Sequence, residues 1–302
     1  MTDKSVKVPR IGIIGGSGLS KLLSLSNVQR VKVETPFGEP SDEVILGTLG
    51  RAQVAFLQRH GPGHQIPPSQ INVRANIAAL KHVGCTQLLS LSAVGSLREE
   101  CPPGSFVLVD QFIDRTIQRE KTFFGRGLVG HVPFGDPVCK RMRTALADVA
   151  SKLKLTYVNG GTYVVMEGPQ FSTRAESNLY RSWGGTVIGM TAMPEAKLAR
   201  EAELCYAMVA MPTDYDCWYD SHEAVTASLV SERMERIAVQ ANALVEQVCD
   251  VLTAHQASCP QGCERALDTA IMTHPASRAP EMLGRLGFVV PRIIQSRDGG
   301  SR

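Results

Sequence analysis

The sequence predicts an α/β protein with a single main domain, in which helices flank a central sheet. Short apolar runs typical of buried strands alternate along the chain with longer amphipathic helical patterns, which is the order of elements in α/β folds. The 302 residues are 43% hydrophobic and 20% charged, as in ordinary globular proteins. A single α/β domain can reach this length, and a chain of this size buries a large hydrophobic core without the help of disulfide bonds or metals.

Strands are expected where short apolar runs are bounded by glycine, proline or polar residues. The longest apolar run, residues 204–211, is far too short to span a bilayer and is typical of a buried strand. The expected strands cover residues 10–14, 52–57, 86–90, 105–110, 162–166, 186–190 and 206–211.

Capping residues mark the expected helices. Asp136 followed by Pro137 predicts an N-cap with proline at the first helical position, and the apolar residues after it fall on one helical face. Thr173 and Glu176 have the spacing of a capping box, and Gly184 is expected to end that helix. Further helices are expected over residues 69–83 and 229–252.

Composition excludes several classes of partner. Lys and Arg total 32 and Asp and Glu 29, and this net charge of +3 is too diffuse for a nucleic-acid-binding face. We expect no membrane partner and no export signal, because the first apolar stretch is interrupted by glycines. The eight cysteines are then expected to be reduced thiols. The expected location is the cytoplasm, and the nucleus is an expected additional location.

The character of the chain changes near its C-terminus. We expect a catalytic domain over residues 1–255 and an irregular extension over 256–302, where proline and glycine are scattered and lysine is absent. Residues 283–294 are apolar enough to dock on another surface, although the function of the extension is open.

The residues near position 260 could form either a zinc site or a plain turn. His255, Cys259, Cys263 and His274 are metal-ligating residue types, but their spacing matches no common zinc motif. Because proline and glycine lie between the two cysteines, a turn explains them better. No metal is therefore expected.

Two loops after predicted strands could bind an anion. Gly15, Gly16 and Ser17 follow the first strand and could offer backbone N–H groups and a hydroxyl, but their spacing is not that of a dinucleotide loop. Arg59 and His60 follow the second strand, where a guanidinium could hold phosphate through two parallel hydrogen bonds. A tight turn and a decorated surface are the respective alternatives.

Three further loops could carry chemistry. The small residues 92–96 permit a close backbone approach to a ligand, although a structural turn explains them as well. Glu167, Phe171 and Ser172 could present a carboxylate, an aromatic face and a hydroxyl to one cavity. Asp214 and Asp216 follow a buried run, where burial and mutual repulsion can keep one carboxyl protonated as a general acid. The alternative is that they cap a turn.

Eight blocks taken together resemble the trimeric purine nucleoside phosphorylase family. They occur in the same order over about residues 10–250, and the closest match is the branch that acts on 5′-methylthioadenosine. The blocks are IGIIGGSGL, RHGPGHQIPPSQINVRANIAAL, SAVGSLREE, DQFIDRT, HVPFGDPVC, MEGPQFSTRAES, GMTAMPEAKLARE and MPTDYDCW.

The resemblance implies a mixed twisted sheet, a homotrimer with active sites at subunit interfaces, and a pentosyl transfer reaction. The expected reaction converts 5′-methylthioadenosine and phosphate to adenine and 5-methylthioribose 1-phosphate, with phosphate as co-substrate and no cofactor. A phosphorylase of broader specificity, acting on adenosine or 6-oxopurine nucleosides, is the alternative enzyme. A nucleotide-binding protein without activity and a nicotinamide dehydrogenase are weaker alternatives.

The resemblance also implies roles for individual residues. Met190 would lie under the ribose, Phe171 would stack on the base, and Asp214 would donate a proton or hydrogen bond to the purine's imidazole nitrogen. Asp216, Ser172 and Tyr215 would complete the base site, and His131 would reach the 5′ pocket of a neighbouring subunit. The implied phosphate site consists of Ser17, Arg59, His60, Ser92, Ala93 and Thr191.

Two positions indicate the substrate within that family. Where 6-oxopurine enzymes have an asparagine, this chain has Asp214, an acceptor suited to an exocyclic amine. Where nucleoside enzymes have a histidine for the 5′-hydroxyl, this chain has Ala227, with Val225 and Val230 nearby. Such an apolar pocket favours a methylthio group by roughly 1–3 kcal/mol. Ser17 and Val94 depart from the usual threonine and cysteine, and the small Ala227 leaves room for adenosine.

Overall fold

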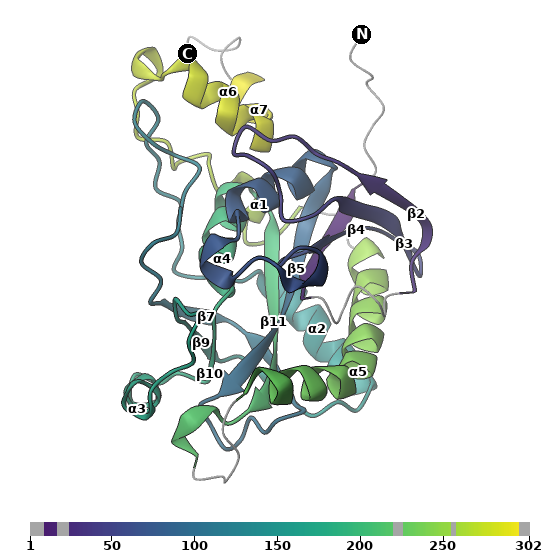
Figure 1. Cartoon of the computed structure of the whole chain (residues 1–302). Helices are drawn as coiled ribbons and strands as arrows, with labels where there is room; N and C mark the ends of the chain where they lie inside the picture. Colours follow the sequence, from purple (N-terminus) through teal and green to yellow (C-terminus); the bar gives the residue numbers. More distant parts are fainter. Residues whose placement is uncertain (1–8, 17–23, 220–225, 255–257, 296–302) are drawn as a thin grey trace.

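The computed structural model describes residues 9–16, 24–219, 226–254 and 258–295, and helices cover both faces of its central sheet (Figure 1). Within this part of the chain no helix has the length and apolar character needed to cross a membrane. The sheet has 11 strands. They are β1 (Arg10–Gly15), β2 (Ser26–Val31), β3 (Val44–Leu49), β4 (Ala52–Gln58), β5 (Cys85–Ser96), β6 (Phe106–Val109), β7 (Gln111–Asp114), β8 (Tyr157–Asn159), β9 (Thr162–Val165), β10 (Val187–Gly189) and β11 (Cys205–Asp214).

The helices pack in two layers. One face of the sheet carries α1, α4 and α6, and the other carries α2 and α5. Short 3₁₀ turns cover Pro62–His64, Pro68–Gln70, Asp216–Trp218, Cys263–Arg265 and Pro275–Ser277. The α-helices are α1 (Val73–His82), α2 (Lys140–Lys152), α3 (Arg174–Ser182), α4 (Ala192–Glu201), α5 (Ala227–Ala254), α6 (Pro280–Val289) and α7 (Arg292–Gln295).

The predicted mixed sheet is confirmed. Strands β4, β1, β5 and β11 are parallel neighbours in that order, while β2 and β3 extend the sheet antiparallel beyond β4. On the other side β10 pairs with the end of β5 in the antiparallel sense, and β9 and β7 follow in parallel. Because the carboxyl ends of the four parallel strands meet at one edge, that edge is where a ligand site is expected.

Two expectations about element boundaries were wrong. Residues 92–96, expected as a loop, belong to β5, which continues to Ser96 because β11 pairs with it along its length. Helix α2 begins at Lys140, three residues after Pro137. The delay has a physical reason: the backbone N–H of Cys139 donates to the Tyr206 carbonyl of β11 (2.8 Å), so this segment stays extended. Strands β2, β3, β7 and β8 were not expected at all.

The other predicted helices are confirmed. The capping box of Thr173 and Glu176 is present, and the left-handed Gly184 (φ 84°) follows the end of α3. Helix α1 is shorter than the range expected for it, 69–83, and helix α5 extends two residues beyond each end of its expected range, 229–252.

The C-terminal extension contains more regular structure than its composition predicts. Leu286 of α6 is fully buried in the core cluster that also contains residues of α1, and the two helices contact each other (Figure 1). Glu203, which is buried between α4 and β11, accepts hydrogen bonds from the Leu267 backbone and the Arg292 guanidinium. The extension is therefore anchored by both apolar contacts and a buried carboxylate.

These contacts predict that the extension contributes to global stability. Leu286→Ala should lower the free energy of unfolding by about 2–5 kcal/mol, since it removes a fully buried side chain and leaves a cavity. Urea denaturation measures this change, and the exposed Glu281→Ala on the same helix is the control. An unfolding midpoint unchanged by Leu286→Ala would mean that the extension unfolds independently.

Candidate active site

Pairing between β5 and β11 places the predicted phosphate and base residues side by side. In the parallel register Ser92 lies opposite Ala210, and Gly95 lies opposite Asp214 at the end of β11. Arg59 follows the end of β4, and its backbone N–H donates to the Gly15 carbonyl at the end of β1 (3.0 Å). The site thus lies at the carboxyl ends of neighbouring strands.

Arg59 is buried, and its guanidinium is held by protein groups. Its Nε donates to Glu195 Oε2 (3.1 Å), and the two side chains are only 3% and 2% exposed. The two terminal nitrogens donate to the Leu91 carbonyl (3.0 Å) and to Ser90 Oγ (2.8 Å). The fork expected for phosphate therefore faces Glu195, which also accepts from the Tyr206 hydroxyl (3.0 Å). Arg59 can therefore offer an anion only those guanidinium N–H groups that are not already bound to Glu195, Leu91 and Ser90.

His60 is buried beside Arg59 in a neutral form. Burial, together with the positive charge of Arg59, lowers the pKa of His60 to about 4. Its Nδ1 lies 2.9 Å from the Ile66 carbonyl, which can only accept, so Nδ1 carries the proton. Nε2 is consequently an acceptor at neutral pH.

Hydroxyl groups gather at the end of β5. Ser92 Oγ lies 3.2 Å from Thr191 Oγ1, which precedes α4, and it donates to the Ala93 carbonyl (3.0 Å). The buried Tyr163 hydroxyl lies next to both side chains. The structure thus joins Ser92, Ala93 and Thr191 directly, and Arg59 reaches β5 at Ser90 and Leu91, just before them, with His60 next to it in sequence. Ser17 lies outside the described residues.

Asp214 and Asp216 form a buried carboxyl pair at the end of β11. They are 5% and 8% exposed. Asp214 accepts from the Thr213 hydroxyl and from the Asp216 backbone N–H, both at 2.8 Å. Burial raises the pKa of Asp214, and it raises the pKa of Asp216 to about 6, with the charge of Asp214 acting in the same direction. Among the described residues no group donates to Asp216 Oδ2.

Gly95 makes room for this pair. A Cβ atom at Gly95 would lie 3.1 Å from Asp214 Oδ1 and 3.2 Å from the Cβ of Asp216. Asp216 itself has a left-handed backbone (φ 51°), which is uncommon for a residue other than glycine. A side chain at position 95 would displace one carboxyl or the other.

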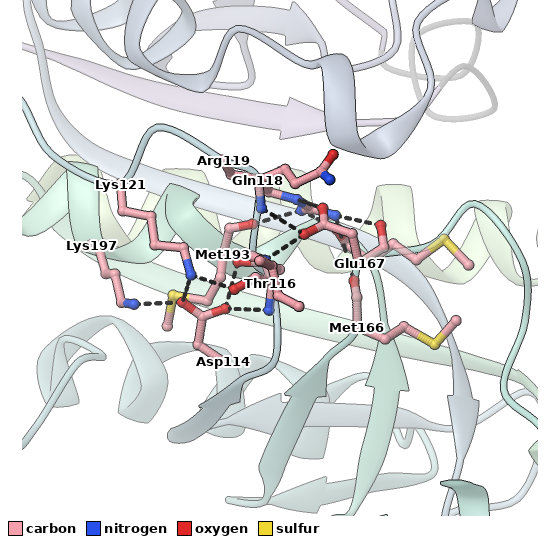
Figure 2. A network of polar contacts seen from close by, with 11 residues as sticks. Asp114, Thr116, Gln118, Arg119, Lys121, Met166, Glu167, Met193 and Lys197 are labelled. Carbon is pink, nitrogen blue, oxygen red and sulfur yellow. Dashed lines mark hydrogen bonds and ion pairs between the residues drawn. The ribbon is translucent and has the colours of Figure 1, made fainter.

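The Glu167 carboxylate was expected to face a cavity, but it is bound by other groups of the protein. Its carboxylate accepts from the backbone N–H groups of Ile117 and Gln118 and from Arg119 Nε (2.7 Å), as Figure 2 shows. Arg119 in turn donates to the carbonyls of Met193 (2.8 Å) and Glu167 (2.7 Å), and also to those of Met166 and Met190. The network fixes the backbone on either side of the site.

The loop after Glu167 lies against the carboxyl pair. The Cys217 thiol donates to the Ser172 carbonyl (3.2 Å), which joins this loop to the segment that holds Asp216. Ser172 Oγ donates to Met166 Sδ (3.4 Å), and Phe171 is 46% exposed. Met190 packs against Gly168, where a Cβ would lie 2.5 Å from its sulfur. Phe171 is therefore accessible to a flat ligand.

Three predicted substrate residues lie farther along the chain. The Tyr215 hydroxyl donates to the Glu99 carbonyl (3.4 Å) and its ring stacks on Tyr219, so its contact with substrate stays a prediction. Ala227 is exposed at the start of α5, and Val230 is half-buried one turn later. Arg233, on the next turn, donates to the Thr213 carbonyl (2.7 Å) and so ties α5 to the carboxyl pair. Val225 lies outside the described residues.

His131 belongs to a different cavity of this chain. Its backbone N–H donates to the Ala270 carbonyl (2.9 Å) of the extension. The cavity, of about 480 Å³, is also lined by Lys121, Lys197 and Glu201. His131 is the one predicted substrate residue among its lining residues.

Sequence reasoning missed several residues that build the site. Glu195, Arg119 and Ser177 received no role, although Glu195 lies within a block that carries the resemblance. Ser177 lies in α3 beside the Asp216 carboxyl. A charged residue inside an apolar helix pattern, as Glu195 is in α4, is a signal for a buried partner. No local pattern marks Arg119, because its acceptors are backbone carbonyls.

Known proteins resemble this chain in both sequence and fold. The S-methyl-5'-thioadenosine phosphorylase of Cereibacter sphaeroides is 52% identical, over 94% of this chain and 98% of its own. A methylthioadenosine phosphorylase from an antarctic soil metagenomic library superposes with a TM-score of 0.86 at 43% identity, over 94% of this chain and 99% of its own. A variant of an adenosine/methylthioadenosine phosphorylase from Schistosoma mansoni, solved with adenine, has a TM-score of 0.77 at 38% identity, over 82% and 93%.

The family model named Phosphorylase superfamily matches residues 10–250, which include all the described elements from β1 to the greater part of α5. That range holds the hydroxyl cluster, the Arg59–Glu195 ion pair and the carboxyl pair. The chain belongs to the phosphorylase superfamily.

Proposed function

We propose that this protein cleaves 5′-methylthioadenosine with inorganic phosphate, giving adenine and 5-methylthioribose 1-phosphate. The observation that carries the proposal is the buried carboxyl pair of Asp214 and Asp216, one strand away from the hydroxyl cluster of Ser92 and Thr191. One group can serve the departing base while the other holds the phosphate. The relatives that share this fold at high identity bear the name of the same activity.

The carboxyl pair supplies the proton that the base needs. Breaking an N-glycosidic bond leaves negative charge on the purine, and a proton or hydrogen bond to its imidazole nitrogen stabilises that charge. Because both carboxyls are buried and have raised pKa values, and the charge of Asp214 raises the pKa of Asp216 further, the two groups titrate as a coupled pair. The second carboxyl then accepts from the exocyclic amine of adenine, an interaction that a 6-oxopurine cannot offer.

The phosphate faces the sugar from the hydroxyl cluster. Ser92 and Thr191 now bond to each other, and both can redirect their hydroxyls to phosphate oxygens, with the Ala93 backbone nearby. Neutral His60 accepts from the protonated oxygen of hydrogenphosphate through Nε2. Arg59 contributes its remaining N–H and fixes the strand ends through Glu195. Holding this nucleophile against the anomeric carbon supplies the proximity advantage, so the chemistry needs no cofactor.

Adenosine is the second candidate substrate. Ala227 is small and exposed and Val230 is half-buried, so this end of α5 offers apolar surface with space for a hydroxyl. The Schistosoma relative bears the names of both substrates. Without a histidine at this position, the 5′-hydroxyl of adenosine loses a partner, whereas a methylthio group keeps its apolar contacts.

The active form in this proposal is a homotrimer. His131 lies in a cavity apart from the carboxyl pair of its own chain, which supports a role in a neighbouring subunit's 5′ pocket. Val129, two residues earlier, is 43% exposed, and Ile117 is 79% exposed. Exposed large apolar side chains such as these are suited to burial against another subunit.

The activity itself is tested by a substrate panel. Release of adenine from methylthioadenosine should depend on inorganic phosphate. The kcat/KM for methylthioadenosine should be higher than that for adenosine by a factor equivalent to roughly 1–3 kcal/mol of transition-state stabilisation. Inosine should be the poorest substrate, because its carbonyl oxygen meets an acceptor. Absorbance assays with and without phosphate measure all three. Equal release without phosphate, or a preference for inosine, would contradict the proposal.

The proton on the carboxyl pair predicts a pH dependence. Since the pKa of Asp216 is raised to about 6, the protonated form is lost as pH rises through that value, and kcat/KM should fall. Asp216→Asn and Asp214→Asn should each reduce kcat/KM by about 10²-fold or more and remove this limb of the profile. The exposed Asp148→Asn is the matched control. The ionisation of phosphate affects all variants equally, so a difference between the pH profiles of the unaltered protein and a variant reports the ionisation of the carboxyl pair. Identical pH profiles would exclude a role of the pair as proton donor.

Subunit sharing is tested by complementation. Each variant alone, His131→Ala or Asp214→Asn, should have reduced activity on methylthioadenosine. In a mixed oligomer, a site built from the Asp214 of one subunit and the His131 of the other is intact. Coexpressed chains should therefore recover activity above the sum of the separate variants, with a trimer mass in light scattering. A monomer with full activity would exclude this arrangement.

A further inference from the structure

Buried cysteines from three separate segments converge at one point on the far side of the sheet from α1. Cys139 is the N-cap of α2, Cys205 is the first residue of β11, and Cys259 and Cys263 belong to the extension. Their four sulfur atoms all lie within 4.8 Å of one another. Exposure of these residues does not exceed 6%.

The spacing of the sulfur atoms fits a metal better than a disulfide. Cys139 Sγ and Cys259 Sγ are 3.6 Å apart, and so are Cys259 Sγ and Cys263 Sγ. A disulfide bond is about 2.05 Å long, and all of these cysteines are free thiols. A zinc ion bound by tetrahedral thiolates at about 2.3 Å requires sulfur atoms about 3.8 Å apart. The observed separations are close to the edges of that tetrahedron.

The turn between the two later cysteines is shaped to bring both sulfurs inward. Gly262 adopts a left-handed conformation (φ 64°), and its N–H donates to the Cys259 carbonyl (2.8 Å). The Cys259 N–H in turn donates to the Glu264 carboxylate (3.0 Å). Lys140, which follows Cys139, donates its backbone N–H to the Gln261 side chain. The turn is thus fixed to the start of α2 by contacts that do not involve sulfur.

Neighbouring donors can offset the negative charge of four thiolates. Arg141 Nη2 lies 3.5 Å from Cys205 Sγ, and the Met142 backbone N–H donates to Cys139 at the N-terminus of α2. The rest of the surroundings is apolar core. A surface hollow of about 390 Å³, lined by Lys140, Arg141, Pro260 and Gln261 among others, offers an approach from solvent.

We propose that Cys139, Cys205, Cys259 and Cys263 bind a zinc ion. With four protein ligands and no open position, the site would be structural, and it would fasten the extension to α2 and β11. The proposal does not depend on the function proposed above. Of the two histidines that the sequence suggested, His274 accepts from the Ala276 backbone N–H and is not part of the sulfur cluster, and His255 lies outside the described residues.

Metal content of the purified full-length protein tests the site. We expect zinc equimolar with the chain, and a content at background for Cys263→Ser. Cys249→Ser is the matched control, since Cys249 is equally buried but lies outside the cluster, and it should keep its zinc. Protein free of zinc, iron in place of zinc, or an intact mass lowered by a disulfide would each overturn the proposal.

A second measurement on the unaltered chain covers the case in which the variant does not fold. Cobalt exchanged for zinc should give the intense visible absorption of a tetrahedral tetrathiolate, which surface histidines cannot produce. Removal of the metal by a chelator should expose four reactive thiols and lower the midpoint of thermal unfolding, and added zinc should reverse both. An absence of cobalt absorption, or a midpoint indifferent to chelator and zinc, would exclude the site.

Discussion

The pairing of β11 with β5 is the constraint on which the site depends. Both strands are almost completely buried, and their parallel register sets Ser92 beside Ala210 and Gly95 beside Asp214. Successive side chains in a strand point to opposite faces of the sheet. A shift of the register by one residue would therefore move the Asp214 side chain to the other face, away from Gly95 and Asp216. The pairing of the long apolar strand β11 therefore sets the distance between the proposed phosphate-binding residues on β5 and the proposed base-binding residues at the end of β11.

Buried charge is handled in two opposite ways within this site. Arg59 and Glu195 neutralise each other, and three further hydrogen bonds complete the coordination of the guanidinium and the carboxylate. Within the described part of the chain, Asp214 accepts from the Thr213 hydroxyl and the Asp216 backbone N–H, and the nearby charge of Arg233 does not offset the effect of burial on its pKa. The first arrangement gives rigidity, whereas the second keeps a proton available near neutral pH. The proposed role of proton donor therefore belongs to the two carboxyls whose pKa values are raised by burial.

Much of this could be predicted from the sequence, for identifiable reasons. Short apolar runs bounded by glycine, proline or polar residues predicted β1, β4 and β11, and the spacing of Thr173 and Glu176 predicted the start of α3. Strand β2 could not be found, because its residues are mostly exposed and carry no apolar alternation. The roles of Glu167 and Arg119 also escaped prediction, since their partners are backbone groups distant in sequence. The cysteine cluster escaped for the same reason: Cys139 and Cys259 are separated by 120 positions.

The anchoring of the extension has a consequence for synthesis of the protein. Leu286, Glu203 and the cysteine cluster all join residues beyond 258 to segments made much earlier. While the last part of the chain is still within the ribosome, the grooves that it will fill remain open to solvent. A chain released early would keep this apolar surface exposed and would be a target for chaperones and proteases. Burial of this apolar surface therefore has to wait until residues 258–294 have left the ribosome and packed on the earlier segments.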